Sequence, residues 1–178
     1  VARGFGREAD LDHCEEQGRA PWAQPKPVSA DARIRGAPQL GTLGSGNHFL
    51  EVQVVDAVFD AEAAEAMGLA KDLVCVMIHS GSRGLGYQVC DDFLAVMAKH
   101  VKTLGISLPD RQLACAPIDS HHGRQYLGAM QAAANFAWAN RQMITHWVRE
   151  SFETVLGTPA ERLGLHLIYD IAHNIAKV

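Results

Sequence analysis

Hydrophobic and polar residues follow patterns that predict three short strands. Residues 49–55 place aliphatic side chains at the even positions and mixed side chains at the odd positions, as in a half-buried strand. Residues 73–78 form a short apolar run that is typical of a buried strand. Residues 165–171 form a similar run, which ends just before His173. We therefore expect three strands, separated by long stretches of other structure.

Apolar residues at helical spacing predict longer elements between these strands. Residues 57–70 are acidic and rich in alanine, and residues 87–104 carry an apolar stripe. Residues 124–156 continue such a stripe, and at 1.5 Å per residue a helix of this length spans about 50 Å. Residues 105–123 are expected to form a loop with a short strand near residues 113–116.

This mixture of strands and helices indicates an α+β fold with mixed sheets and flanking helices. We expect residues 1–178 to be part of one domain. Residues 1–35 are polar and contain three prolines, so they are predicted to form a peripheral arm with a short helical turn near residues 28–35. Residues 36–178 are predicted to form the core that carries the candidate site.

Composition and charge narrow the class of protein. Hydrophobic residues make up 48% and charged residues 20% of the 178 residues, which excludes a disordered or fibrous chain. No apolar run approaches the roughly 18–20 residues of a membrane span, so no membrane partner is expected. The net charge of −4 implies that any nucleic acid binds at a local site. The four cysteines lack CxxC and zinc-finger spacing, which fits reduced thiols in the cytoplasm.

Three histidines lie next to the predicted strands, where a rigid scaffold can present ligands. His48 precedes the first strand, His79 follows the second and His173 follows the third. Neutral imidazole is a good ligand for transition metals. The spacing alone does not show that the three converge, and each is also compatible with an ordinary loop position. His121 and His122 are set aside, because adjacent side chains point apart and their neighbours indicate a loop.

A Gly-rich segment at residues 79–86 links the second strand to the next helix. Backbone N–H groups in such a turn, ahead of a helix N-terminus, can bind an anion. Arg83 adds a guanidinium that can grip a phosphate at two points. The alternative is a tight connection with an exposed arginine.

A second Gly-rich segment at residues 41–51 ends in the first strand. Its three glycines allow the backbone to approach a ligand closely. If strand alternation begins at Asn47, then Asn47, Phe49 and Glu51 share one face. An amide, an aromatic ring and a carboxylate suit a nucleobase, although a hairpin strand with a polar outer face explains them equally well.

Four segments of the chain resemble one known family. Residues 35–49 read RGAPQLGTLGSGNHF and residues 78–86 read IHSGSRGLG. Residues 134–142 read ANFAWANRQ and residues 169–177 read YDIAHNIAK. In this order they are similar to the motifs of the RtcB-type RNA-splicing ligases, and the resemblance runs over nearly the whole chain.

The resemblance implies an RNA ligase that joins a 2′,3′-cyclic phosphate or 3′-phosphate end to a 5′-hydroxyl end, in tRNA splicing or RNA repair. It implies GTP and manganese as cofactors, with two manganese ions in the complete enzyme, and guanylated enzyme and RNA 3′-guanylate as intermediates. The expected partners are GTP and RNA, in the form of tRNA exon halves or broken RNA ends. A protein activator similar to archease is left open. The expected location is the cytoplasm, and the expected fold is α+β with the metals in a deep cleft.

For the metal, the resemblance implies that His48, His79 and His173 are manganese ligands. The family's bridging cysteine and the aspartate near it have no counterpart before Gly36, and its guanylated histidine has none up to Val178. We therefore expect the 178 residues alone to be inactive. Two alternatives to the ligase follow: an inactive segment of such an enzyme, or a phosphoesterase in which three histidines hold a metal that activates water.

For the substrates, the resemblance implies that Asn47, His48, Phe49 and Glu51 line the guanine nucleotide site. Asn47 is also implied to be a catalytic residue that contacts the guanylate or its phosphate. Arg83 is the second implied catalytic residue, and it would hold the terminal phosphate of the RNA.

Overall fold

The computed structural model describes residues 2–177, and it combines helices with one two-stranded antiparallel sheet, as in an α+β protein. Mixed sheets were expected, but this part of the chain holds only the antiparallel pair. The helices and strands, in chain order, are α1 (Glu8–Asp12), the 3₁₀ turn η1 (Glu15–Gly18), α2 (Ala30–Gly36), η2 (Ala37–Gln39), β1 (Phe49–Val54), α3 (Ala61–Ala66), β2 (Val74–His79), α4 (Arg83–Thr103), η3 (Arg111–Leu113) and α5 (His121–Leu156).

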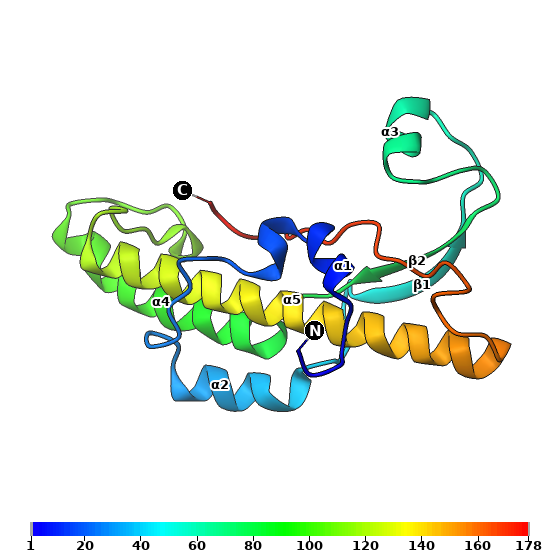
Figure 1. Cartoon of the computed structure of the whole chain (residues 1–178). Helices are drawn as coiled ribbons and strands as arrows, with labels where there is room; N and C mark the ends of the chain where they lie inside the picture. Colours follow the sequence, from blue (N-terminus) through cyan, green and yellow to red (C-terminus); the bar gives the residue numbers. More distant parts are fainter. Residues whose placement is uncertain (1, 178) are drawn as a thin grey trace.

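Three helices form the body of the molecule. Figure 1 shows α4 lying along α5 and α2 packed against α4, with the β1–β2 ribbon toward the other end of α5 and α3 held away from the body. Apolar side chains of these helices, together with Val28 just before α2, make the larger core cluster, which contains Val28, Ala32, Val89, Phe93, Met97 and Ala129. The predicted helix at residues 87–104 is confirmed, although α4 begins four residues earlier, at Arg83.

Helix α5 is the longest element, and at 1.5 Å per residue it spans about 54 Å. It begins where the Ser120 hydroxyl accepts a hydrogen bond from the Gly123 backbone N–H at 3.0 Å, which satisfies one free donor of the first turn. It ends at Gly157, whose left-handed conformation (φ 63°) terminates the helix. The helix predicted at residues 124–156 is therefore confirmed.

The two strands pair with Phe49 opposite His79 and Val54 opposite Val74. Their positions match the sequence prediction, but their burial does not. The aliphatic face, expected to be buried, is open: the exposed fractions of Val52, Val54 and Val74 are 60%, 59% and 53%. The reason is that the sheet has only two strands, and nothing else in residues 2–177 covers this face.

Two predicted strands are absent from the part of the chain that the structure describes. Residues 165–171 have no regular secondary structure, and their only sheet-type pairing is an isolated bridge between Cys14 and Asp170. The strand expected at residues 113–116 is instead irregular chain after η3. Both segments have the apolar composition of a strand, but neither meets a partner along its length.

The first 35 residues, expected to be a peripheral arm, contribute buried side chains to the body. Ala20 packs against Ala134 and Trp138 of α5, in the smaller core cluster. Asp10, only 3% exposed, accepts two hydrogen bonds from the Arg149 guanidinium at 2.7 and 2.8 Å. The division of the chain into an arm and a core of residues 36–178 stays a prediction. None of the helices between residues 2 and 177 has the length and apolar character of a membrane span.

Candidate functional site

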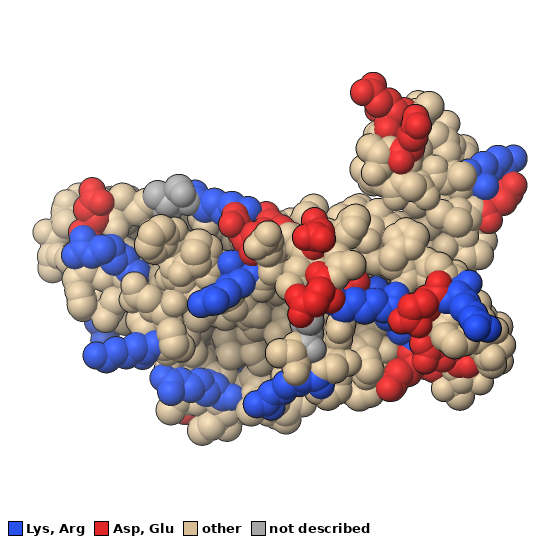
Figure 2. Space-filling model, viewed as in Figure 1, with Lys and Arg blue, Asp and Glu red and all other residues tan. Residues whose placement is uncertain are grey.

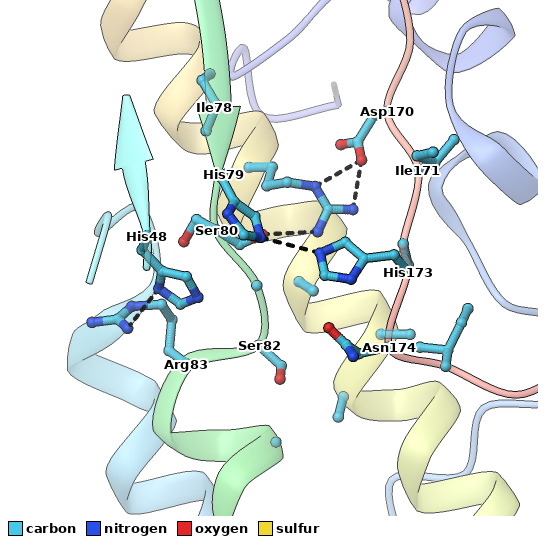
Figure 3. A pocket seen from close by; sticks show the side chains of 18 of the residues that line it. His48, Ile78, His79, Ser80, Ser82, Arg83, Asp170, Ile171, His173 and Asn174 are labelled. Carbon is cyan, nitrogen blue, oxygen red and sulfur yellow. Dashed lines mark hydrogen bonds and ion pairs between the residues drawn. The ribbon is translucent and has the colours of Figure 1, made fainter. Parts of the chain in front are cut away.

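A cavity of about 980 Å³ lies where the end of β2, the start of α4, the middle of α5 and the C-terminal segment meet. It contains the three histidines and the arginine that the sequence singled out. Figure 3 shows His79 and His173 pointing toward one another from opposite walls, with His48 and Arg83 together on one side. The structure therefore brings together four side chains that are up to 125 positions apart in the sequence, from His48 to His173.

The three imidazole rings are close neighbours. The ring centroids of His48 and His79 are 5.8 Å apart, and those of His79 and His173 are 5.3 Å apart. The Nε2 atoms of His79 and His173 face each other at 3.1 Å. Imidazole nitrogens gathered in this way have the chemistry of a transition-metal site.

The rings supply only part of a donor set. Manganese also takes carboxylate and water oxygens, yet residues 2–177 contain no group of three or more His, Cys, Asp and Glu side chains arranged to hold one ion. His48 is turned toward Arg83, whose guanidinium lies 3.4 Å from its Nδ1. The three histidines thus fit a metal in the type of donor atom that they offer, and their assignment as ligands stays a prediction.

The electrostatics around His48 favour its neutral form. Burial, the Arg83 guanidinium and His79 together lower the pKa of His48 below its usual value of 6.5. A neutral imidazole is the form that ligates a metal. Gly44 allows the approach of these groups, because a Cβ atom at its position would overlap both the His48 ring and the Arg83 guanidinium.

Arg83 occupies the first residue of α4 in a left-handed conformation, with φ of 52°. Backbone strain of this kind persists where the surrounding contacts hold it, and it is frequent at functional sites. The Arg83 Nε atom lies 3.3 Å from the Thr42 hydroxyl. The backbone N–H of Gly84 donates to the Gln39 side chain at 2.7 Å, so this N–H is not free to bind an anion. The Arg83 guanidinium is therefore a stronger candidate for anion binding than this N–H group.

The residues implied for the nucleotide divide into two groups. His48 and Phe49 line the cavity, and the Phe49 ring meets His79 edge to face at 5.3 Å. Asn47 and Glu51 are exposed and do not line it. The Glu51 carboxylate instead accepts a hydrogen bond from Gln53 at 2.7 Å. The structure therefore does not gather all four into one pocket.

Sequence reasoning missed an ion pair in the cavity wall. The Arg141 guanidinium on α5 binds the Asp170 carboxylate, with nitrogen–oxygen distances of 2.5 and 2.7 Å, and donates to the Ser80 carbonyl at 3.2 Å. Burial raises the pKa of Asp170, and Arg141 offsets part of this rise. The signal in the sequence that could have revealed this pair was a charged residue, Arg141, within the apolar stripe of the helix predicted at residues 124–156. His121 and His122, which were set aside as loop residues, instead begin α5; His122 lies beside His100, and both are outside the cavity.

The charge distribution fits a local site for an anion. On the face shown in Figure 2, basic and acidic side chains are interspersed, and the α3 lobe carries acidic groups. No single basic surface dominates this face. This face therefore offers no broad positive surface, and Arg83 is the candidate anion-binding group among the residues that line the cavity.

The sequence of this chain is similar to that of one known family. A sequence model of the family described as tRNA-splicing ligase RtcB matches residues 1–178. Proteins named tRNA-splicing ligase RtcB from Archaeoglobus fulgidus, Methanococcus maripaludis and Thermococcus kodakarensis are 60%, 58% and 58% identical over 177, 177 and 178 residues. These alignments cover 99%, 99% and 100% of this chain, which spans 37% of the length of each relative.

Proposed function

Because the chain belongs to the tRNA-splicing ligase RtcB family, we propose that the complete protein is a GTP- and manganese-dependent RNA ligase. It joins a 2′,3′-cyclic phosphate or 3′-phosphate end to a 5′-hydroxyl end, through a guanylated enzyme and an RNA 3′-guanylate, in tRNA splicing or RNA repair. The observation that carries this proposal is the convergence of His48, His79, His173 and Arg83 on one cavity.

Within this proposal, the histidines and the arginine have separate tasks. His48, His79 and His173 hold manganese through neutral imidazole nitrogens. When bound, the metal neutralises charge on phosphate oxygens. Arg83 holds the terminal phosphate of the RNA, because its planar guanidinium matches two phosphate oxygens. Asp170 is partly buried just before His173 and is bound to Arg141, so it keeps that loop in place.

The nucleotide part of the proposal rests on the strand that follows the first loop. Phe49 offers an aromatic edge to the cavity, and Asn47 and Glu51 flank it in sequence. For Asn47 to contact a guanine nucleotide, residues 44–47 have to change conformation when GTP binds, whereas Glu51 is held in β1 opposite Met77 and shares the strand face of Phe49. Gly44 and Gly46, both with positive φ, give that segment the freedom to do so.

The test is incubation of the full-length protein with manganese and GTP labelled at the α-phosphate. We expect covalent labelling of the protein, and sealing of an RNA 3′-phosphate to a 5′-hydroxyl end. His79→Ala should abolish both, whereas His121→Ala, an exposed histidine outside the cavity, should leave both intact. Metal-dependent hydrolysis of a phosphoester without any labelling by GTP would replace the ligase with the phosphoesterase alternative.

A further inference from the structure

Two adjacent polar residues lie inside α5, facing the loops of the candidate site. Asn140 is fully buried and Arg141 is 9% exposed. Neither is a ligand or substrate contact in the function proposed above. A buried amide or guanidinium is retained only where hydrogen bonds compensate for the loss of water.

Asn140 joins the two Gly-rich loops through its single side chain. Its Oδ1 atom accepts hydrogen bonds from the backbone N–H groups of Gly41 and Thr42, at 2.7 and 3.1 Å. Its Nδ2 atom donates to the Thr42 carbonyl, the Ser80 hydroxyl and the Gly81 carbonyl, each at 3.1 Å. One amide therefore connects the loop that leads to His48 with the loop that follows His79.

Ser80 strengthens this connection, because its hydroxyl donates to the Leu43 carbonyl at 2.7 Å. Arg141 adds the third loop. Its guanidinium binds Asp170, three residues before His173, and also the Ser80 carbonyl at 3.2 Å. Consecutive residues of one helix thus contact all three segments that carry the candidate metal ligands.

We infer that Asn140 and Arg141 are positioning residues, which fix the relative placement of His48, His79 and His173 for metal binding. The metal in this inference rests on the proposed function, whereas the hydrogen bonds that connect the loops do not depend on that function. Only an amide can accept from two N–H groups and donate to two carbonyls at one place. Aspartate, which has the same shape, keeps the acceptor and loses the donors.

Asn135 provides a matched control on the same helix. Its amide accepts from the Ala20 backbone N–H at 2.7 Å and donates to the Ala20 carbonyl at 3.5 Å, so it secures the N-terminal segment, and neither hydrogen bond reaches a site loop. Asn135→Asp and Asn140→Asp therefore impose the same chemical change on two amides of one helix. Arg141→Lys is the second test variant, because a single ammonium cannot reach Asp170 and the Ser80 carbonyl together.

The experiment combines two measurements on the full-length protein. In hydrogen–deuterium exchange without metal, Asn140→Asp should speed exchange most in residues 79–86, and Arg141→Lys should do so in residues 79–86 and 167–173. Asn135→Asp should affect neither segment. In titrations with manganese alone, followed by electron paramagnetic resonance, both site variants should bind about 10- to 100-fold more weakly. Asn135→Asp should bind as the unmodified protein does, even if its melting temperature falls equally.

The outcomes separate the two proposals. Unchanged exchange at residues 79–86 in both Asn140→Asp and Arg141→Lys overturns the positioning role, whatever the protein catalyses. Faster exchange with unchanged manganese affinity also overturns it, because the two residues are then merely structural. If the unmodified protein binds no manganese, the proposed function fails, and the exchange data alone decide whether Asn140 and Arg141 hold the loops.

Discussion

At Arg83, the free-energy cost of the strained backbone can be measured separately from the proposed role of the side chain in binding phosphate. A residue with a Cβ atom loses about 1–2 kcal/mol in the left-handed region, because Cβ approaches the following carbonyl oxygen. Glycine avoids this cost but loses about 0.5–1 kcal/mol through the greater freedom of its unfolded backbone. Arg83→Gly should therefore be more stable than Arg83→Ala by about 0.5–1 kcal/mol. Both variants lose the same guanidinium contacts, with Thr42 and His48, so the comparison isolates the backbone.

Differential scanning calorimetry of the full-length protein measures this difference. We expect Arg83→Gly to melt about 1–2 °C above Arg83→Ala, a small shift because the free energy is spread over a large protein. An alanine variant that melts at or above the glycine variant would show that residue 83 is not in the left-handed region, and the strain argument would fail.

The same two variants test the chemistry. Both should still become labelled with GTP, since Arg83 is proposed to hold the RNA and not the nucleotide. Both should be slow to transfer GMP to an RNA 3′-phosphate. Arg83→Lys should recover only part of the rate, because a point charge does not reproduce two-point binding. Loss of labelling in Arg83→Ala would place this residue in the nucleotide site instead.

Three further predictions concern single features of the fold. Burial alone raises the pKa of Asp10, but hydrogen bonds and charge from its partners outweigh burial and hold the pKa below 3.8. The ion pair between Asp10 and Arg149 therefore stabilises the protein fully above pH 3.8, and this stabilisation is lost as the pH falls through the lowered pKa of Asp10. Asp10→Asn leaves Arg149 buried and unpaired, so it should lower the free energy of unfolding, measured in urea at pH 7, by about 3–5 kcal/mol. It should also flatten the fall in stability at acid pH. Burial, aided by nearby carboxylates, raises the pKa of Cys14 to about 11, so iodoacetamide at pH 8 should alkylate Cys14 more slowly than the exposed Cys90, and equal rates by mass spectrometry would contradict this. Gly44→Ala, which places a methyl group where His48 and Arg83 meet, should reduce GTP labelling far more than Gly46→Ala, which also has positive φ (74°, against 115° at Gly44) but open space around it; equal losses would show that contact with His48 and Arg83 is not what makes Gly44 necessary.

Local patterns predicted the elements whose contacts are mainly local or whose length is large. Helix α5 combines a serine cap, a long apolar stripe and a terminating glycine, and each of these acts within a few residues. The strands predicted at residues 49–55 and 73–78 are present as Phe49–Val54 and Val74–His79, although the sequence did not predict that they pair with each other. Helix α4 begins earlier than predicted because Gly84 and Gly86 weaken the helical signal of its first turn.

Burial and strand pairing depend on distant parts of the chain, and the sequence-based predictions of these two features were wrong. An apolar run such as residues 165–171 becomes a strand only if another strand runs beside it, and here it meets Cys14 at a single bridge. The aliphatic face of β1 and β2 has the pattern of a buried surface, yet Val52 and Val54 are mostly exposed. The pattern shows which face prefers burial, but it carries no information about what covers that face.

The candidate site shows the same division between residue type and placement. Its histidines could be chosen by their chemistry and by their positions near strand ends, but their convergence depends on α5, which contributes no ligand. The apolar stripe of that helix runs through Ala137 and Ile144, and the expected positions between them are taken by Asn140 and Arg141. A polar pair at stripe positions has to find several hydrogen-bond partners, because an unsatisfied buried amide or charge costs more than the helix can offset. Those partners are the loops that carry the histidines, so the interruption in the stripe marks the place where distant segments of the chain are brought together.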